Sequence, residues 1–568
     1  MKRRIIIVGG VAGGASAAAR IRRLDADAQI VMFERGEHVS FSNCCLPYHL
    51  SGTVENSDSL VLMTPERFWK QYGIEVRVQS EVTAVHPGKK QVTVRNLETG
   101  ESYTETYDKL ILAPGANPIM PRSIAGIDRE HVFSIRNVTD IKELKHYIDT
   151  RNVKKAAVIG GGFIGVETAE NLKMAGLTAA LVEGTEQIML PFDYDMVQIL
   201  HKEMLDSGVE MHLSSMLTEI REHSILIQCG DEIKEIEADA VVMAIGVSPE
   251  TTLAREAGLA IGETGGILVN KNFQTSDPDI YAVGDAAESF NRLLGRPGRL
   301  ALAGPAQRQA RGAADHIYGS SGANRGFIGS SCIRIFGLNA ACTGLNEKNA
   351  KSAGISCDIA YVLAADKVGL MPGSSYMNFK LVFEVPTGRI LGAQAIGKGN
   401  TDKRIDVIAA MITMGGTLAD LKDLELCYSP VFGTARDVVN QAALVGQNLL
   451  DCRYRQVPVS EVRGLVESGA FIVDVREEQE FQAGHLKNAH NIPLSQLRQR
   501  MQEIPRGIPV YVHCRTGQRS YNAVCCLQGH GYQNLWNISG SFLGVSLYEY
   551  FNDRTEGREP VVTEYNFK

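Results

Sequence analysis

Two cysteines far apart in the chain, Cys44 in S-F-S-N-C-C-L-P-Y and Cys514 in H-C-R-T-G-Q-R-S, occupy two different kinds of loop. A cysteine thiolate can attack a sulfur–sulfur bond, and a cysteine among cationic side chains and backbone N–H groups can carry sulfur as a persulfide. Between them lie two glycine-rich turns of the kind that binds dinucleotides. The combination predicts chemistry on sulfur, with electrons supplied through bound dinucleotides.

The first glycine turn, G-G-V-A-G-G from Gly9 to Gly14, follows the apolar segment Arg4–Val8 and precedes a predicted helix over Ala15–Leu24. Such a turn presents backbone N–H groups and a helix N-terminus to a pyrophosphate. A second apolar strand, Gln29–Phe33, ends at Glu34, whose carboxylate can accept from a ribose hydroxyl. We therefore predict a nucleotide site in this segment.

The second glycine turn repeats the design in full G-x-G-x-x-G register, with Gly160, Gly162 and Gly165. A strand over Ala156–Ile159 precedes it, and a strand over Ala179–Val182 leads to Glu183. No arginine lies close to Glu183, and its carboxylate would repel a 2′-phosphate. We therefore expect the second nucleotide to be NADH rather than NADPH.

Three further segments support this organisation: Lys109–Ala116 and Ala240–Glu250 run into glycine turns, and Ile280–Ala287 contains Asp285. Together with the two turns, they resemble the two-dinucleotide-fold flavoprotein reductases over roughly residues 1–325. The resemblance implies an FAD site formed by Gly9, Gly10, Ala12, Gly13, Gly14, Glu34, Arg35, Ala113, Gly115, Gly284 and Asp285. It implies a nicotinamide nucleotide site formed by Gly160, Gly162, Gly165, Glu183 and Gly246.

The cysteine pattern separates this chain from the disulfide reductases that use a C-x-x-x-x-C pair, because Cys44 has no partner at that spacing. The segment around it resembles that of the coenzyme A-disulfide reductases, in which one cysteine forms a mixed disulfide with coenzyme A. The resemblance makes Cys44 the redox cysteine, with Ser40 and Asn43 in the substrate site. Asn43 and the flavin would stabilise its thiolate. The alternative is a cysteine that only packs in the core.

Coenzyme A also needs cationic anchors for its phosphates. Ser16, Arg20 and Arg23 lie at i, i+4 and i+7, on one face of the predicted first helix. They match coenzyme-binding positions of the resembled family, and Arg436 matches a cationic position that is reached from the other subunit. A solvated basic helix face is the alternative reading of the arginines.

Residues 326–446 resemble the family's dimerisation domain, which places Tyr428 near the partner's flavin and redox cysteine. Its hydroxyl could hydrogen-bond a developing thiolate or sulfur anion. The chain departs from the family pattern at Leu370 and Met371, which replace a usual tyrosine segment, and at Cys45, where a small residue usually follows the redox cysteine. These departures lie around the substrate sulfur and leave the substrate open among disulfide, persulfide and polysulfide.

A new α/β pattern begins near residue 459, with strands predicted at Phe471–Val473 and Pro509–His513 and a helix at Tyr521–Leu527. Cys514 lies between strand and helix with Arg515 and Arg519, in a loop whose N–H groups favour a thiolate or persulfide. This segment, with V-D-V-R-E and A-G-H-L-K-N-A-H-N-I-P, resembles a rhodanese domain. The resemblance makes Cys514 a sulfur carrier and the two arginines substrate-binding. An inert adaptor domain is the alternative.

Composition limits the possible partners. The chain has 568 residues, a formal net charge of −7 and no apolar run of membrane-spanning length, so we expect neither nucleic acid nor membrane as a partner. Its N-terminus has no room for a signal-peptide core, and its eleven cysteines contain no C-x-x-C. We expect a cytoplasmic protein without a metal site.

The predicted fold is α/β: a two-dinucleotide-domain flavoprotein reductase with an α+β dimerisation domain and a C-terminal rhodanese. The domains are residues 1–115 and 245–325 for FAD, 116–244 for NAD, 326–446 for dimerisation, 447–458 as linker, 459–551 as rhodanese and 552–568 as tail. We expect a homodimeric enzyme that uses NADH to reduce coenzyme A persulfide, polysulfide or coenzyme A disulfide. The alternatives are an NADH oxidase or peroxidase, and a redox-sensing adaptor for sulfur trafficking.

Overall fold

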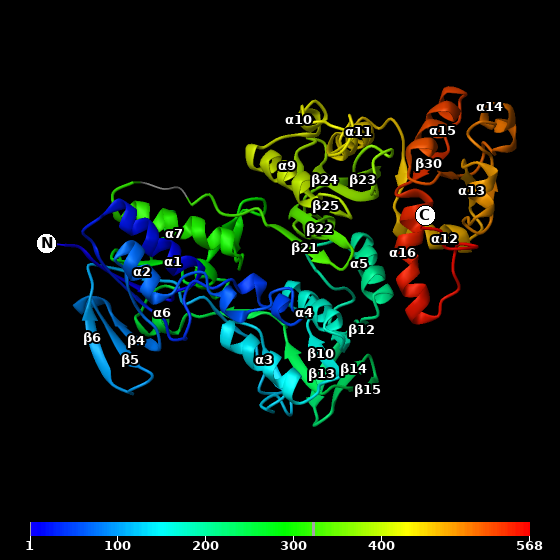
Figure 1. Cartoon of the computed structure of the whole chain (residues 1–568). Helices are drawn as coiled ribbons and strands as arrows, with labels where there is room; N and C mark the ends of the chain where they lie inside the picture. Colours follow the sequence, from blue (N-terminus) through cyan, green and yellow to red (C-terminus); the bar gives the residue numbers. More distant parts are fainter. Residues whose placement is uncertain (1, 321–323, 568) are drawn as a thin grey trace. The chain divides into compact units, whose positions relative to one another are not determined.

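The computed structural model describes residues 2–320 and 324–567, and the chain divides into two units (Figure 1). The first unit draws on Met1–Glu186 and Val209–Phe327. The second draws on Gln187–Gly208 and Ile328–Lys568. The segment Gln187–Gly208 therefore belongs with the second unit, although the sequence placed it inside the predicted NAD domain.

The first parallel sheet of the first unit has the order β18-β7-β1-β2-β3. Its strands are β1 (Arg4–Val8), β2 (Gln29–Phe33), β3 (Glu75–Arg77), β7 (Lys109–Leu112) and β18 (Ile280–Ala282). Helix α1 (Ala12–Leu24) packs against α7 (Ala303–Ile317). Helix α1 begins three residues earlier than predicted, inside the glycine turn. A Cβ on Gly14 would lie 1.8 Å from the Gly9 carbonyl oxygen, so only glycine allows this close packing.

The second parallel sheet of this unit has the order β12-β11-β10-β16-β9. Its strands are β9 (Val132–Ser134), β10 (Lys155–Ile159), β11 (Thr178–Val182), β12 (Glu210–His212) and β16 (Ala240–Met243). Helix α4 (Phe163–Met174) follows the second glycine turn and contacts β10 and β11. Both predicted nucleotide segments therefore have strands at the expected residues, because their apolar side chains are buried on both faces.

Shorter elements surround the two sheets. Two three-stranded antiparallel sheets are formed by β4 (Ser80–His86), β5 (Gln91–Asn96) and β6 (Ser102–Thr106), and by β13 (Ser215–Ile220), β14 (Ser224–Cys229) and β15 (Glu232–Glu237). Two-stranded pairs are β8 (Ala116–Pro118) with β17 (Val247–Pro249), and β19 (Ser289–Asn291) with β20 (Arg296–Gly298). The remaining α-helices of the unit are α2 (Pro65–Tyr72), α3 (Val138–Thr150) and α6 (Thr252–Glu256).

The second unit contains an antiparallel sheet with the order β21-β22-β25-β24-β23. Its strands are β21 (Ser330–Ile335), β22 (Leu338–Gly344), β23 (Cys357–Ala365), β24 (Tyr376–Glu384) and β25 (Ile390–Gly397). Its helices are α8 (Glu347–Ser352), α9 (Thr401–Met414), α10 (Leu418–Lys422) and α11 (Val438–Leu450). Helix α9 contacts β22 and β25, and α11 contacts β23 and β24, so the sheet and these helices share one core.

Helix α5 (Tyr194–Asp206) explains why the segment Gln187–Gly208 joins the second unit. The buried ammonium of Lys380 on β24 lies 2.9 Å from Asp195, 3.1 Å from Asp193 and 2.8 Å from Glu347. A buried lysine needs carboxylate partners, so this ion cluster fixes α5 to the antiparallel sheet. The glycine motifs that indicated the NAD domain in the sequence say nothing about this contact between α5 and the antiparallel sheet.

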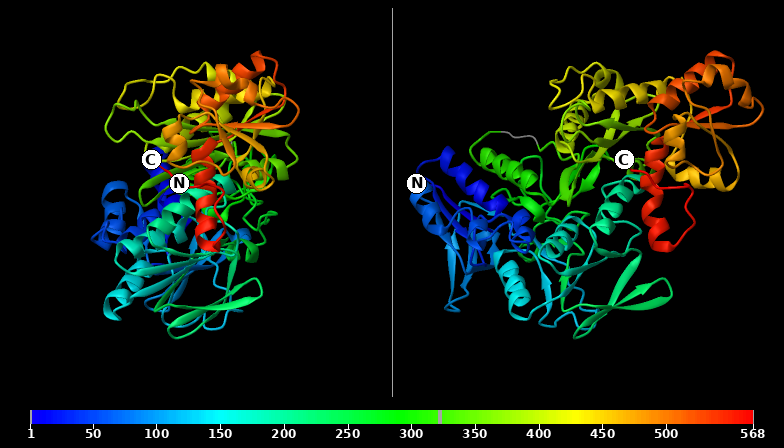
Figure 2. Two further views of the ribbon diagram at one scale, coloured as in Figure 1. Left: turned by 90° about the vertical axis from the view of Figure 1, so that its right-hand side faces the viewer. Right: turned by 45° about the vertical axis from the view of Figure 1, so that its right-hand side comes forward.

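The C-terminal part of the second unit is a parallel sheet with the order β26-β30-β29-β27-β28. Its strands are β26 (Gln456–Val457), β27 (Phe471–Asp474), β28 (Ala489–Asn491), β29 (Val510–His513) and β30 (Leu535–Ile538). Its helices are α12 (Val462–Glu467), α13 (Glu478–Gln482), α14 (Leu497–Arg500), α15 (Gln518–Gly529) and α16 (Ser541–Glu556). Helix α16 packs against α5 (Figure 2).

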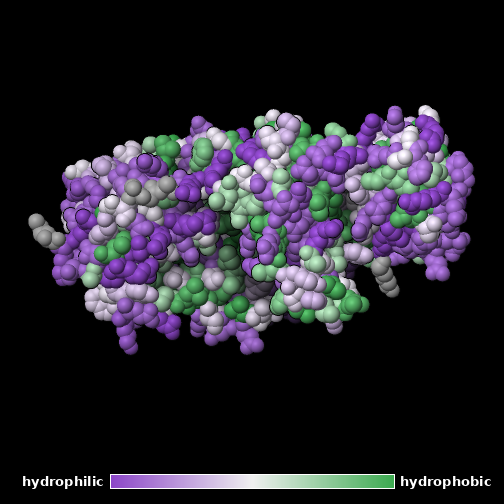
Figure 3. Space-filling view, turned by 90° about the horizontal axis from the view of Figure 1, so that it is seen from above, coloured by the Kyte–Doolittle hydropathy of each residue, from purple (hydrophilic) through white to green (hydrophobic). Residues whose placement is uncertain are grey.

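Two segments predicted as linker and tail have definite structure. Helix α11 continues to Leu450 and β26 begins at Gln456, so the irregular connection is shorter than residues 447–458. Residues 552–556 belong to α16, and Val561 and Val562 beyond it are buried. The face seen in Figure 3 is mainly hydrophilic, with hydrophobic side chains in small groups. No helix among residues 2–320 and 324–567 has the length and apolarity needed to cross a bilayer.

Candidate active site

Cys44 lies on a short 3₁₀ turn, Asn43–Cys45, and its side chain is exposed. The loop that carries it is fastened to the first glycine turn, since the Ser40 N–H donates to the Gly10 carbonyl at 2.8 Å. Ser40 has a φ of 48°, a left-handed conformation that is uncommon for a residue with a side chain. The predicted redox cysteine, Ser40 and the first turn therefore form one local structure.

The protein groups around Cys44 disfavour its thiolate. Desolvation by the surrounding protein atoms raises the pKa of the thiol, and the charges of Glu167, Cys45 and Asp285 raise it further. The chain alone therefore does not supply the thiolate stabilisation expected from the sequence. The Asn43 Oδ1 atom is buried and accepts no hydrogen bond from the described residues, so it can serve a bound ligand.

Glu167 on α4 is a site residue that the sequence reasoning missed. The Tyr48 hydroxyl, on the turn after Cys44, donates to Glu167 Oε1 at 3.3 Å. Burial raises the pKa of Glu167 to about 7, against the opposing effect of the Tyr48 hydrogen bond. A carboxyl group with this pKa exchanges its proton near neutral pH. Its position two residues after the second glycine motif is the only signal in the sequence.

The first glycine turn and its surroundings form a cradle that fits FAD. Glu34 Oε2 accepts from the Gly10 N–H at 2.8 Å and Oε1 accepts from the Gly36 N–H at 2.9 Å, which fixes the carboxylate at the end of β2. A Cβ on Gly9 would lie 2.1 Å from the Ala113 oxygen, so the turn packs directly on the end of β7. Gly13 is buried in α1, which begins at Ala12. A hollow of about 150 Å³ adjoins the turn, lined by Glu34, Arg35, Asn43, Ala113, Gly115 and Arg136, among others.

Asp285 lies on the turn Gly284–Ala286 after β18. Burial raises the pKa of its carboxyl, and Arg136, whose guanidinium lies 3.7 Å away, opposes this effect. Arg136 was not predicted, because S-I-R-N has no distinctive motif. A Cβ on Gly115, with φ of 76°, would lie 2.5 Å from the Arg136 Nη2 atom. The cradle thus contains a carboxylate and a guanidinium 3.7 Å apart.

The second glycine turn repeats this construction around Glu183. The carboxylate accepts from the Gly161 N–H at 2.6 Å and from the N–H and hydroxyl of Thr185 at 2.8 and 2.9 Å. Gly160 and Gly246 have φ values of 112° and 111°. Gly165 is buried in α4, and a Cβ on it would clash with the Gly160 oxygen at 1.9 Å.

The space at this turn fits a nicotinamide nucleotide. No atom of the described chain lies within 4 Å of a Cβ placed on Gly162, so a pyrophosphate has room to approach the backbone there. Three donors bind Glu183, and its carboxylate has four lone-pair sites, so one site is left for a further donor such as a ribose hydroxyl.

The predicted coenzyme A face of α1 is only partly available. The Arg20 Nε donates to Asp315 on α7 at 2.6 Å, which ties this guanidinium to the protein. Arg23 is exposed and Ser16 is half-buried. The roles of Ser16, Arg20 and Arg23 in binding coenzyme A stay predictions, and Arg20 has a carboxylate partner 295 residues away in the sequence.

Tyr428 and Arg436 lie in the second unit and Cys44 in the first, so their meeting stays a prediction. Tyr428 is 51 % exposed, next to the exposed Cys427, and Leu370 is 88 % exposed. The loops that carry them are joined by a hydrogen bond from the Val368 N–H to the Pro430 carbonyl at 3.3 Å. Exposed Arg436 lines a hollow of about 300 Å³ with Cys427.

Cys514 follows β29 and precedes α15, as predicted, and is only 1 % exposed. The Gly517 N–H donates to its sulfur at 3.1 Å, and the Ser541 hydroxyl lies 3.9 Å from it and 3.2 Å from its backbone nitrogen. Gly517 has a φ of 110°, which turns the loop into the N-terminus of α15. The Cys514 sulfur therefore lies beside a backbone N–H at the N-terminus of α15 and close to a hydroxyl.

Both arginines of the Cys514 loop have protein partners. Arg519 forms a bidentate pair with Glu480 at 2.6 and 2.7 Å. The Arg515 Nη2 donates to the Asn566 carbonyl at 3.3 Å. Burial lowers the pKa of Arg515, and neighbouring Arg476 lowers it further, so the guanidinium lies in a cationic, partly dry environment. An anion at the loop would relieve that crowding.

Asp474 and Arg476 form a fully buried pair below this loop, with Nη2 to Oδ2 at 2.6 Å. Arg476 also donates to the Gly484 carbonyl at 2.7 Å and stacks over Phe542 at 4.2 Å. These contacts connect β27 to the segments around it, which agrees with a structural role for the pair.

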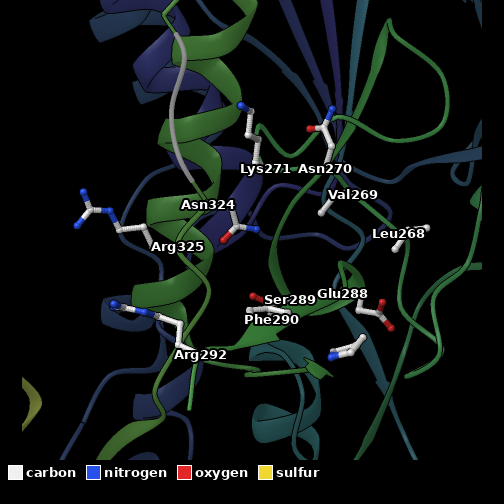
Figure 4. A pocket seen from close by; sticks show the side chains of 11 residues that line it. Leu268, Val269, Asn270, Lys271, Glu288, Ser289, Phe290, Arg292, Asn324 and Arg325 are labelled. Carbon is white, nitrogen blue, oxygen red and sulfur yellow. The ribbon is translucent and has the colours of Figure 1, made fainter. Parts of the chain in front are cut away.

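The most voluminous of the characterised hollows, about 610 Å³, contains none of the predicted site residues (Figure 4). Its cationic side chains, Lys271, Arg292 and Arg325, do not point toward one another. Among residues 2–320 and 324–567, no group of three or more His, Cys, Asp or Glu side chains is placed to hold a metal ion.

Three family models match the chain. A model described as pyridine nucleotide-disulphide oxidoreductase matches residues 3–310, the dimerisation domain of the same group matches 331–438, and a rhodanese-like domain matches 458–547. The predicted fold class is confirmed by these matches and by the sheets described above.

Known proteins of similar sequence and structure agree with the family models. A coenzyme A disulfide reductase of Staphylococcus haemolyticus is 31 % identical over 448 residues, which cover 79 % of this chain and 100 % of the relative. The reduced CoADR-RHD of Bacillus anthracis is 41 % identical, with a TM-score of 0.93 and coverage of 98 % of this chain and 99 % of that chain. A NAD-dependent persulfide reductase from A. fulgidus is 32 % identical, with a TM-score of 0.90 and coverage of 95 % and 99 %.

Proposed function

Because the chain belongs to the pyridine nucleotide-disulphide oxidoreductases and carries their dimerisation domain and a rhodanese-like domain, we propose that it is an NADH-dependent reductase of coenzyme A persulfide or polysulfide. The similarity to coenzyme A disulfide reductases and a persulfide reductase supports a flavin-dependent disulfide or persulfide reductase. Coenzyme A disulfide is a related substrate, because it also reacts at a sulfur–sulfur bond.

The observation that carries the proposal is the placement of Cys44. It is an exposed thiol outside any disulfide, on a loop hydrogen-bonded to the FAD cradle. A single nucleophile beside a flavin reacts by forming a mixed disulfide with its substrate. The bound nucleotides supply the electron pair that breaks this disulfide.

The chain's own residues would then divide the work around that bond. The Cys44 thiolate attacks the substrate sulfur, forming a Cys44–sulfur bond as the outgoing thiolate or hydrosulfide leaves and takes up a proton. Glu167, in contact with Tyr48 on the turn after Cys44, holds a proton near neutral pH. Glu183 would accept from the adenosine ribose of NADH and disfavour the 2′-phosphate of NADPH, while Ser16, Arg20 and Arg23 would contact coenzyme A.

The rhodanese-like domain favours persulfide over a plain disulfide as substrate. Its Cys514 is surrounded by N–H and hydroxyl groups that would stabilise a persulfide anion. A sulfur carrier has little use in the reduction of a plain disulfide, whereas it can accept sulfane sulfur and pass it to coenzyme A. Names of the similar structures, CoADR-RHD and persulfide reductase, support the same assignment.

We further propose a cytoplasmic homodimer. The dimerisation-domain match supports it, and the second unit exposes several large apolar side chains on the loops near Tyr428, including Leu370, Val431 and Phe432. Such side chains are typical of a covered surface. Dimer formation would bring Tyr428 and Arg436 to the partner's Cys44 site.

The experiment that tests the proposal compares NADH turnover with coenzyme A persulfide, oxygen and hydrogen peroxide. We expect kcat/KM to be highest for the persulfide, with sulfide released in step with NADH consumption. Preferred turnover of oxygen or peroxide would show an NADH oxidase or peroxidase. Absence of turnover with all three, in a chain that retains its flavin, would favour the redox-sensing adaptor.

A further inference from the structure

The C-terminal strap, residues 559–567, runs along the rhodanese-like domain to the loop of Cys514. The Thr563 N–H donates to the His485 carbonyl and the Lys487 N–H to the Val561 carbonyl, each at 2.8 Å. Val561 and Val562 are each 2 % exposed. The first half of the strap therefore packs its two valines into the core of the rhodanese-like domain and hydrogen-bonds the segment His485–Lys487.

The second half of the strap ends at the Cys514 loop. The Asn566 carbonyl accepts from Arg515 Nη2 at 3.3 Å, so the strap contacts the residue that follows the sulfur carrier. The Tyr565 hydroxyl donates to Asp553 on α16 at 2.6 Å. Two independent contacts thus place Tyr565 beside α16 and Asn566 at the loop of Cys514.

An aromatic cluster anchors the same half to helix α5. The rings of Tyr565 and Phe567 lie 5.1 and 5.2 Å from the Tyr550 ring, both edge-on. The Lys202 ammonium on α5 lies 4.3 Å from the Phe567 ring centre and 4.9 Å from that of Tyr550. Cation–π contacts of this kind are weak individually, so the cluster can open without unfolding the domain.

Cys514 itself gives the reason to expect such opening. A side chain that is 1 % exposed cannot meet a sulfur donor in solution until a covering group moves. Arg515, its neighbour, is the group held by the strap, and it lies among the cations Arg476 and Arg519. An anionic donor would compete for its N–H groups with a neutral carbonyl, and the charged hydrogen bond is the stronger of the two.

We propose that the C-terminal strap is a latch over the sulfur carrier. When Tyr565–Phe567 are docked, they hold Arg515 and keep sulfur donors from Cys514. When they release, Arg515 becomes available to an anionic donor such as thiosulfate or a persulfide. The proposal rests on the proposed role of Cys514 as sulfur acceptor. The latch docks on helix α5, which the ion cluster around Lys380 fixes to the antiparallel sheet.

Two variants test the latch in the full, FAD-loaded protein. A chain that ends at Glu564 lacks the docked aromatic residues but keeps the buried Val561 and Val562. Phe567→Ala removes only one ring from the cluster. Glu564→Ala is the matched control, since this exposed side chain belongs to the same strap but lies outside the latch contacts.

The first readout is alkylation of Cys514 by iodoacetamide, followed by peptide mass spectrometry, which reports access without requiring sulfur transfer. We expect the truncated chain and Phe567→Ala to react roughly three- to tenfold faster than the wild type, and Glu564→Ala to react at the wild-type rate. The second readout is kcat/KM for transfer from thiosulfate to cyanide, where the same ranking is expected. NADH-dependent reduction of a small persulfide should stay unchanged.

Equal alkylation rates in the wild type, the truncated chain and Phe567→Ala, all with wild-type thermal unfolding, would overturn the latch. Faster alkylation without any thiosulfate turnover in any variant would instead overturn the sulfur-acceptor role of Cys514. If the truncated chain unfolds at lower temperature, Phe567→Leu decides the matter: it keeps apolar packing and loses the cation–π contact, so its Cys514 should still react faster. An unchanged rate in Phe567→Leu would then refute the latch.

Discussion

Glu183→Gln should reverse much of the expected preference for NADH over NADPH. Glu183 accepts from Gly161 at 2.6 Å and from Thr185 at 2.8 and 2.9 Å, so its charge is fixed where the adenosine ribose would lie. A charge-assisted hydrogen bond to the ribose contributes about 1.5–3 kcal/mol. Repulsion of a 2′-phosphate at roughly 5 Å adds about 1–3 kcal/mol at an intermediate dielectric. Glutamine keeps an acceptor for Thr185 but removes the charge.

These two effects act in the same direction on the coenzyme ratio. Glutamine removes the repulsion and about half of the hydrogen-bond contribution, which together amount to about 1.8–4.5 kcal/mol. The NADPH-to-NADH ratio of kcat/KM should therefore rise by roughly 20- to 1,500-fold in Glu183→Gln, since each 1.4 kcal/mol corresponds to about tenfold. The assay is anaerobic stopped-flow reduction of the bound flavin by each coenzyme. Glu186→Gln is the matched control, because it removes the same charge from an exposed position three residues along the chain. A wild-type preference for NADPH, or an equal shift in both variants, would refute the reasoning.

Three further predictions concern the sulfur sites. Cys45→Gly should retain most reductase activity, because the resembled family works without a thiol there; a loss as large as that of a Cys44 variant, in steady-state NADH assays, would mean that the pair acts as a dithiol. Cys514→Ala should abolish sulfur transfer from thiosulfate but leave NADH-dependent reduction of small coenzyme A persulfides intact, and sulfide release measures both. Identical kinetics for wild type and variant with small and bulky persulfides would show that the rhodanese-like domain takes no part in persulfide reduction. The third prediction concerns Glu167, whose folded-state pKa of about 7 lies above the usual 4.5. Protonated Glu167 therefore stabilises the folded protein relative to the unfolded chain, and this contribution is fully present below pH 4.5 and is lost as pH rises through 7. We expect the free energy of unfolding, measured by urea titration with flavin release as the signal, to fall between pH 5 and 8 by roughly 1–2 kcal/mol more in the wild type than in Glu167→Gln. An equal pH dependence in the two proteins would refute the raised pKa of Glu167.

The sequence located the elements that are fixed by local pattern and by burial. Strands β1 and β2 lie at the predicted residues because each is a short apolar run before a turn or an acid. The predicted start of helix α1 was three residues too late. Glycines have a low helix propensity, so Gly13 and Gly14 did not indicate a helix, but their lack of a side chain allows the first turn of α1 to pack closely there. Cys514 was placed correctly between strand and helix.

Features that depend on distant pairs could not be predicted in this way. The ion pair between Arg20 and Asp315 joins two helices that lie 295 residues apart in the sequence, and no local pattern indicates it. Glu167 and Tyr48 lie 119 residues apart and meet only in the fold. The strap looked like a polar tail, because its two buried valines form too short a run to indicate an element.

The central claim is that Cys44 alone forms the covalent link to coenzyme A during reduction. It is tested most directly by intact-protein and peptide mass spectrometry of the FAD-loaded enzyme after treatment with coenzyme A disulfide, before and after one equivalent of NADH. We expect one coenzyme A bound per chain through Cys44, its release as coenzyme A thiol on addition of NADH, and no adduct in Cys44→Ser despite retained flavin. An adduct on another cysteine, or wild-type turnover by Cys44→Ser, would contradict it.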